Sequence, residues 1–91
     1  MVNRFKSGFG MVSNTVLRDP EVNLQEKALY AYLSTYADGN GELFVSVNKM
    51  ASELAMGVSS VNRQLKNLEQ KGIIARISRG FHTSRITKLL K

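Results

Sequence analysis

The side chains best suited to molecular recognition gather on one predicted helix, residues 59–71. At about 100° per residue, Leu65 and Leu68 each fall within about 40° of Val61, and the three form a side that a core would bury. The opposite side has no carboxylate and presents hydroxyl, amide and cationic groups: Ser59, Arg63, Lys66 and Gln70, with Asn62 and Asn67 on the flanks. Such groups read base edges in the major groove. The pattern favours a nucleic-acid contact over an ordinary solvated face, which would mix charges of both signs.

The residue types on this face indicate different contacts. A guanidinium can pair bidentately with guanine O6 and N7, so we expect Arg63 to read a base. Asn62 and Asn67 suit either adenine or a phosphate. The ammonium group of Lys66 acts as a point charge, which suits a phosphate. The helix therefore combines candidate base readers with candidate phosphate contacts.

Ser59 and Ser60 stand where this helix is expected to begin. Backbone N–H groups and the helix dipole favour a phosphate at a helix start, and both hydroxyls are candidates to join such a contact. Ser59 equally suits a structural N-cap, because a serine oxygen commonly accepts a hydrogen bond from the first turn. The two roles can coexist.

A β-hairpin is predicted after this helix. β-Branched residues at 73–77 and the return at 85–89 indicate two strands, and the polar segment 78–84 indicates the tip between them. Gly80 permits a tight turn, and a guanidinium beside it would reach into or across a minor groove. His82 is mostly neutral at pH 7 and suits a surface loop position or a phosphate contact. The hairpin contributes five candidate contacts: Arg76, Arg79, Gly80, His82 and Arg85.

Two earlier predicted helices would support this face. The first begins at Asn23, with Glu26 at the spacing of a capping box, and ends before the glycine-rich turn at 38–41. Its apolar positions, spaced at a helical period, are Leu24, Ala28, Leu29, Tyr32, Leu33 and Tyr36. Tyr30, Tyr32 and Tyr36 are candidate contacts between protomers, and for Tyr32 and Tyr36 the pattern favours the core instead.

The second supporting helix starts at the N-cap Ser46, and its apolar positions are Val47, Met50, Ala51, Leu54 and Ala55. Gly57 is expected to end this helix as its C′ residue, and Ser59 to cap the next helix after one intervening residue. Gly72 is expected to close that next helix, with Lys71 favourably placed in the last turn beside the negative end of its dipole.

The length and composition suit one small domain: 91 residues, of which 43% are apolar and 22% charged. We expect a flexible basic arm at residues 1–8 and a single domain at 9–91. Within the domain, residues 9–17 are expected to be a short strand or irregular, and residues 43–45 a short strand. The absence of Cys and the single His exclude a disulfide framework, a zinc knuckle and any site with two imidazoles. No P-loop motif is present either, so no enzymatic activity, metal or cofactor is expected.

Positive charge is concentrated in the last third of the chain. The 13 basic and 7 acidic side chains give a net charge of +6, and residues 59–91 carry 8 basic and 1 acidic, a net +7. This asymmetry indicates a polyanionic partner, nucleic acid first and an acidic membrane second, with a solvated basic face as the alternative. No run approaches 18 apolar residues, so a cytoplasmic protein without a membrane segment is expected.

Several motifs resemble those of winged helix-turn-helix proteins. Residues 50–59 resemble the turn motif of helix-turn-helix proteins, with Met50 in place of the usual Leu. Residues 61–74 resemble the pattern V-x-R-x-L-x-x-L-E-x-x-G-L-I, which ends a recognition helix and enters the wing. Residues 17–20 and 24–38 look like the N-terminal DNA-binding domain of plasmid and phage replication initiators and replisome organisers. The resemblance covers roughly residues 9–89 and implies a small α+β winged helix-turn-helix, with three main helices and a C-terminal two-stranded β-hairpin wing.

This resemblance implies a sequence-specific double-stranded DNA-binding protein, with residues 59–71 in the major groove and residues 76–85 on the backbone or in the minor groove. A transcriptional regulator, or a replication or conjugation accessory factor of a plasmid, phage or other mobile element, fits the small size. Because one small module binds weakly, we expect a homodimer or paired copies on repeated half-sites. The alternatives are a winged-helix module that binds an acidic protein partner and a winged helix that binds RNA.

Overall fold

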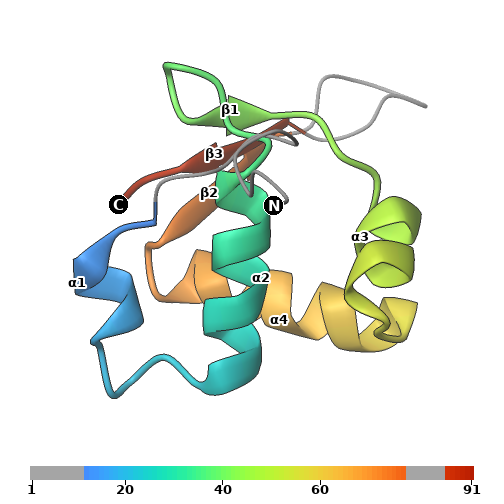
Figure 1. Ribbon diagram of the computed structural model, residues 1–91, viewed down its shortest axis with the longest axis horizontal. Coiled ribbons are helices and arrows are strands. Elements are labelled where there is room, and N and C mark those ends of the chain that lie inside the picture. The colour runs from blue at the N-terminus through green and yellow to red at the C-terminus, as the bar shows by residue number, and fades with distance from the viewer. Residues whose placement is uncertain (1–11, 78–85) are drawn as a thin grey trace, which may run out of the picture.

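The computed structural model describes residues 12–77 and 86–91 (Figure 1). Within these ranges the elements follow the order α1 (Asn14–Leu17), α2 (Leu24–Ser34), β1 (Glu42–Leu43), α3 (Val47–Leu54), α4 (Val58–Gln70), β2 (Ile74–Ile77) and β3 (Ile86–Leu89). None of these helices is long and apolar enough to cross a membrane. The predicted basic arm at residues 1–8 lies outside the described ranges.

The three described strands form an antiparallel sheet in the order β1–β3–β2, so β3 lies between the other two. The pairing of β2 with β3 confirms the two predicted hairpin strands. β1 pairs with the other edge of β3, Glu42 lying opposite Lys88. The strand expected at residues 43–45 is therefore shorter and begins one residue earlier, and its pairing extends the expected two-stranded wing to a three-stranded sheet. The predicted tip at residues 78–84 lies outside the described residues.

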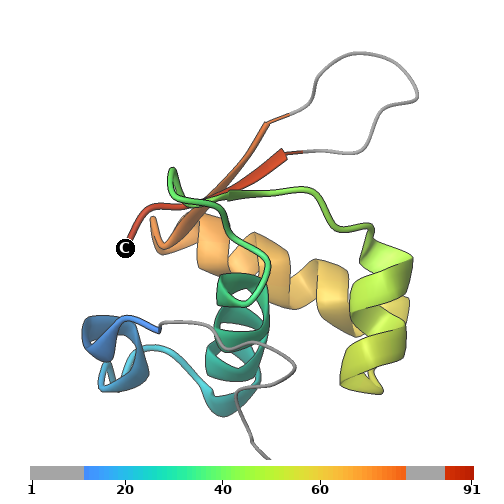
Figure 2. The same cartoon turned by 45° about the horizontal axis from the view of Figure 1, so that its top comes forward.

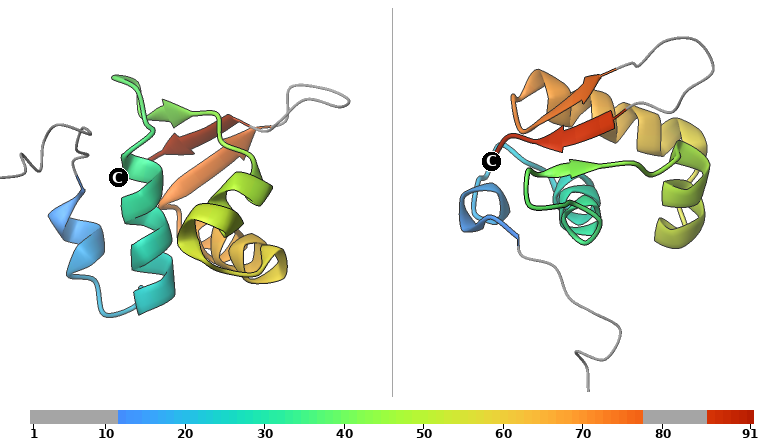
Figure 3. Two further views of the ribbon diagram at one scale, coloured as in Figure 1. Left: turned by 45° about the vertical axis from the view of Figure 1, so that its right-hand side comes forward. Right: turned by 90° about the horizontal axis from the view of Figure 1, so that it is seen from above.

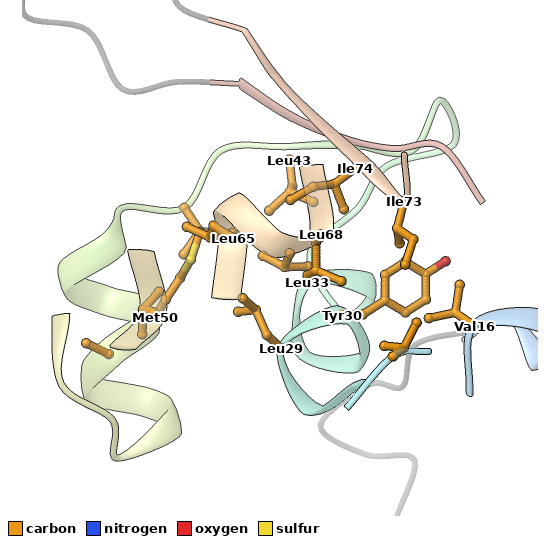
Figure 4. Close-up of a cluster of buried hydrophobic side chains, with 14 residues drawn as sticks. Val16, Leu29, Tyr30, Leu33, Leu43, Met50, Leu65, Leu68, Ile73 and Ile74 are labelled. Atoms are coloured by element: carbon orange, nitrogen blue, oxygen red, sulfur yellow. The ribbon is translucent and has the colours of Figure 1, made fainter. Parts of the chain in front are cut away.

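The core lies where α2 and α4 cross below the sheet (Figure 2). Its most buried side chains, at most 1% exposed, include Leu29 and Leu33 of α2, Leu65 and Leu68 of α4, and Ile74 of β2 (Figure 4). Burying one such side chain stabilises the fold by about 1.5–3 kcal/mol, so these residues hold both helices against the sheet. The arrangement is the α+β winged helix-turn-helix fold that the sequence predicts.

The tyrosines of α2 are placed differently from the prediction. Tyr30 is 1% exposed, and its hydroxyl donates to the carbonyl oxygen of Lys91, so its assignment as a contact between protomers is wrong. Burial raises the pKa of this phenol. The half-buried Tyr32 and the exposed Tyr36 instead donate to Oε1 of Glu53 on α3, at 2.6 and 2.5 Å. Tyr30 lies beside Val16 of α1 in the core (Figure 4), so the buried side of α2 is rotated towards Tyr30.

A short helix occupies part of the segment predicted as a strand or irregular. α1 is closed by the N–H of Leu17 donating to the carbonyl of Ser13 at 3.1 Å. Val16 of this turn is 1% exposed and belongs to the core, beside Tyr30 (Figure 4). The burial of Val16 outweighs the preference of a β-branched residue for a strand, so the prediction is wrong for these residues.

The connection between α3 and α4 also differs from the prediction. Ala55, directly after Leu54, is the C-cap of α3 and adopts the left-handed region with φ of 54°. Gly57 has φ of −71° and is the N-cap of α4, so it does not end α3 as a C′ residue. Ser59 consequently lies inside the first turn of α4 and is not its N-cap. The prediction assigned the end of α3 to Gly57 because glycine adopts positive φ without strain.

The predicted starts of α2 and α3 are confirmed. Asn23 Oδ1 accepts a hydrogen bond from the N–H of Glu26 at 2.8 Å, and Glu26 Oε1 accepts one from the N–H of Asn23 at 3.1 Å. These reciprocal bonds form the predicted capping box. Ser46 Oγ accepts a hydrogen bond from the N–H of Lys49 at 3.1 Å. Both supporting helices therefore begin at positions that local sequence determines.

Gly72 closes α4 as predicted and provides a test of this helix end. Its φ is +70°, and no atom lies within 4 Å of the place where a Cβ would be. We expect Gly72→Ala to lower the free energy of unfolding by about 1–2 kcal/mol through backbone strain alone, measured by urea unfolding. Gly39→Ala is the matched control, because Gly39 also faces open space and its φ is not positive. Equal effects of the two substitutions would contradict the assignment of strain to Gly72.

Candidate nucleic-acid interface

α4 separates an apolar side from a polar side along its length. Val61, Leu65 and Leu68 are at most 1% exposed and belong to the core that α4 shares with α2 and β2. The predicted recognition residues lie on the surface, with Ser59, Asn62, Arg63, Lys66 and Gln70 exposed and Ser60 and Asn67 partly exposed. The predicted orientation of the helix is confirmed, and the contact of these residues with nucleic acid stays a prediction.

A groove of about 510 Å³ lies where α4 meets β2. It is lined by Asn62, Leu65, Lys66, Glu69, Gln70 and Arg76. The structure thus brings Arg76 of the wing beside polar side chains of the predicted recognition helix, and Figure 3 shows β2 lying along α4 in its right panel. Cationic, amide and carboxylate groups all border the groove, so it offers both hydrogen-bond donors and acceptors.

Glu69 makes this groove less uniformly basic than the exposed face of α4. Glu69 is partly exposed and lines the groove. Its carboxylate opposes the charge of Lys66 and Arg76, and it can accept a hydrogen bond from the amino group of cytosine. The groove therefore has acceptor as well as donor character.

Four predicted wing contacts lie outside the described residues: Arg79, Gly80, His82 and Arg85. The described part of the wing reaches Ile77 at the end of β2 and resumes at Ile86, and these two residues are paired. Arg76 is therefore the predicted wing contact that the structure places beside α4. The other four stay predictions.

The start of α4 differs from the starts of α2 and α3. No side chain caps its first turn, because the N-cap residue is Gly57, whereas Asn23 and Ser46 cap their helices. Ser59 and Ser60 lie within this first turn. The alternative role of Ser59 as an N-cap is wrong, and the contact of both serines with a phosphate stays a prediction.

Two polar contacts between α2 and the α4 region are not predicted from the sequence. Gln64 is 3% exposed, and its Nε2 donates to Oε1 of Gln25 at 2.7 Å. Nζ of Lys71 lies 2.9 and 2.7 Å from the two carboxylate oxygens of Glu26, a residue that is 1% exposed. The partners are 39 and 45 positions apart in the chain, so no local spacing signals either pairing. Lys71, expected to complement a helix dipole, is thus engaged away from the exposed face of α4.

A second polar cluster joins α3 to α2. The hydroxyls of Tyr32 and then Tyr36, both donating to Glu53, hold the pKa of this carboxyl below its usual range. Burial, followed by the bond to Glu53, raises the pKa of Tyr32. Nζ of Lys49 lies 5.3 Å from the centre of the Tyr36 ring. Near neutral pH Glu53 is therefore ionised and accepts both bonds, which fixes α3, and with it the turn that leads into α4, relative to α2.

Comparisons with known proteins agree with this geometry. A family model described as a helix-turn-helix domain matches residues 22–74, a range that contains α2, α3 and α4. A solved structure described as the N-terminal domain of a DNA-binding protein is similar with a TM-score of 0.70 and 20% sequence identity, covering 96% of this chain and 77% of that chain. At this identity the likeness shows a shared fold. A search of curated protein sequences finds no match.

The ion pair between Lys71 and Glu26 provides a test of how α4 is held. Lys71→Met leaves the carboxylate of Glu26, 1% exposed, without its cation, so we expect the free energy of unfolding to fall by about 1–3 kcal/mol. Adding Glu26→Gln removes the uncompensated charge and should restore most of the loss. Lys49→Met, which removes an exposed cation, should change the free energy by about 0.5–1 kcal/mol or less. Urea unfolding of the four proteins measures this, and equal losses in the single and double variants would contradict it.

Proposed function

The chain belongs to the helix-turn-helix domain family, and we propose that it binds double-stranded DNA sequence-specifically, with α4 in the major groove. The observation that carries the proposal is the groove between α4 and β2. There Asn62, Lys66 and Gln70 of the helix meet Arg76 of the wing. A basic and amide-rich surface shared by a recognition helix and a wing suits simultaneous contact with bases and backbone.

The dimensions of α4 support this docking. The helix has 13 residues, which corresponds to a length of about 20 Å. A helix is about 10–12 Å wide with its side chains, and the major groove of B-DNA is about 12 Å wide. Because its apolar side is buried in the core, α4 would enter the groove with Arg63 and Lys66 foremost.

We assign separate roles to the residues of this surface. Arg63 reads a guanine, and Asn62 and Asn67 contact an adenine or a phosphate. Lys66, with the hydroxyls of Ser59 and Ser60 in the first turn, contacts phosphates. The wing lies on the backbone or in the minor groove through Arg76 and through the residues outside the described ranges, Arg79, Gly80, His82 and Arg85.

The biological role that we propose is that of a transcriptional regulator, or of a replication or conjugation accessory factor of a plasmid, phage or other mobile element. The resemblance of residues 17–20 and 24–38 to initiator and replisome-organiser domains supports this role. The similar solved structure is itself described as a domain of a DNA-binding protein. We propose a cytoplasmic, non-enzymatic protein that acts as a homodimer or as paired copies on repeated half-sites, because one small module buries little DNA surface.

Selection from a random duplex pool tests the proposal. The protein is mixed with the pool at 50–100 mM salt, bound duplexes are recovered by mobility shift, and enriched sequences are read. We expect one sequence motif to be enriched, and failure to enrich any sequence would contradict sequence-specific binding. Salt-dependent capture of an acidic protein in place of DNA would favour an interaction module, and preference for structured RNA would favour an RNA-binding winged helix.

Arg63→Ala tests the base contact. We expect affinity for the selected duplex to fall about 5- to 150-fold, the equivalent of one bidentate contact worth about 1–3 kcal/mol, with little change for a random duplex. Arg18→Ala is the control, because Arg18 is an exposed cation that directly follows α1 and belongs to neither α4 nor the wing. An equal loss of affinity for the selected and random duplexes would indicate that Arg63 contacts the DNA backbone and does not read a base.

Lys66→Ala tests the phosphate contact. We expect the logarithm of the wild-type binding constant to fall against the logarithm of salt concentration with a slope of about −4, if about four to five phosphates are neutralised. The variant should weaken binding to all duplexes similarly and reduce the magnitude of the slope by about 1. Fluorescence anisotropy at several salt concentrations measures both quantities. A salt slope of the variant equal to that of the wild type would contradict a phosphate contact by Lys66.

A further inference from the structure

We propose that Gln25 and Glu26 of α2 are positioning residues that set the rotation of α4 about its own axis and so determine how selectively it reads DNA. They act through a polar clamp, defined here as the Gln25–Gln64 hydrogen bond and the Glu26–Lys71 ion pair. The inference rests on the proposed DNA-binding function of α4. It assigns a role in specificity to residues that do not themselves face DNA.

The clamp lies on one flank of α4. Gln64 and Lys71 are seven positions apart, which brings them to within about 20° of one another around the helix axis. Asn62, Lys66 and Glu69 line the groove with β2 on the other flank. α4 and its C-cap are thus held by α2 on one side and by the wing on the other, with the exposed recognition residues between them.

Apolar packing decides which side of α4 is buried, and it restricts the exact rotation of the helix less sharply than a directional contact does. The hydrophobic effect acts on area and has no preferred direction, whereas a hydrogen bond weakens steeply when its geometry changes. A rotation of about 20° moves a side-chain atom at a radius of about 6 Å by about 2 Å. That displacement is larger than the range of distances over which a hydrogen bond to a base edge forms. Directional contacts on α4 therefore keep its side chains in a constant position relative to the base edges that they read.

Stability does not explain the clamp. Gln64 is 3% exposed, and its Oε1 is buried without a hydrogen-bond partner among the described residues. A leucine at this position would avoid the unmade bond. In the ion pair only Glu26 is buried, and replacing a buried charge and its partner by apolar groups is often at least as stabilising. The polar groups of the clamp therefore restrict the orientation of α4 relative to α2, which apolar groups of the same size would not do.

Gln64→Leu separates the two roles. We expect an unfolding midpoint in urea no lower than that of the wild type. We also expect the ratio of affinities for the selected and random duplexes to fall about 10-fold or more, since a displaced base contact resembles a mismatch. Affinity for the random duplex should stay within about 2-fold, because phosphate contacts tolerate small shifts. Ser34→Ala is the matched control: Ser34 is a buried polar residue of α2 that donates to the Tyr30 carbonyl, and its replacement should leave the ratio unchanged.

A second variant, Glu26→Gln with Lys71→Met, removes the ion pair, while glutamine still completes the capping box of α2. This double variant should also reduce the ratio of affinities for the selected and random duplexes. In ¹H–¹⁵N spectra of the DNA-free proteins, the α4 amide resonances of both clamp variants should shift or broaden, and those of Ser34→Ala should match the wild type. An unchanged affinity ratio in both variants, or α4 resonances at their wild-type positions, would overturn the inference. A wild-type protein that prefers no duplex would refute the proposed function, and the α4 resonances would still decide whether the clamp positions the helix.

Discussion

Burial of the apolar side of α4 is the constraint on which the rest of this structure depends. Leu65 and Leu68 lie between α2 and the sheet, and their burial decides how the two helices cross and where the wing begins. The same burial leaves Arg63 and Lys66 exposed. The candidate interface is therefore a direct consequence of core packing, and a substitution that shifts the core also shifts the residues offered to DNA.

Features that depend on neighbouring residues could be predicted from the sequence. The capping box of Asn23 and Glu26 and the glycine stop at Gly72 involve a few consecutive residues, so spacing alone identifies them. The pairing of β2 with β3 follows from two β-branched segments around a polar tip. For the candidate site, the residue types of α4 and its exposed side were predictable because a helical period places them.

Features that depend on tertiary contacts could not be predicted. Helical periodicity alone does not decide between Tyr30 and Tyr32 as the core residue, since the choice depends on tertiary neighbours of α2 such as Val16. Ala55 adopts the left-handed conformation at the end of α3, although Gly57 follows two residues later. Gly57 does not take this position because it is the N-cap of α4. The position of Arg76 beside the recognition helix likewise requires the path of β2 along α4.

The central position of β3 has a consequence for the order in which the fold is assembled. Neither β1 nor β2 pairs with the other, and both require β3, which follows them in the chain. During synthesis on the ribosome the helices can pack while both strand edges still lack partners, a state in which strands are prone to associate with other chains. Insertion of β3 pairs one edge of β1 and one edge of β2 at the same time, which joins the strand before α3 and the wing after α4 in one cooperative unit.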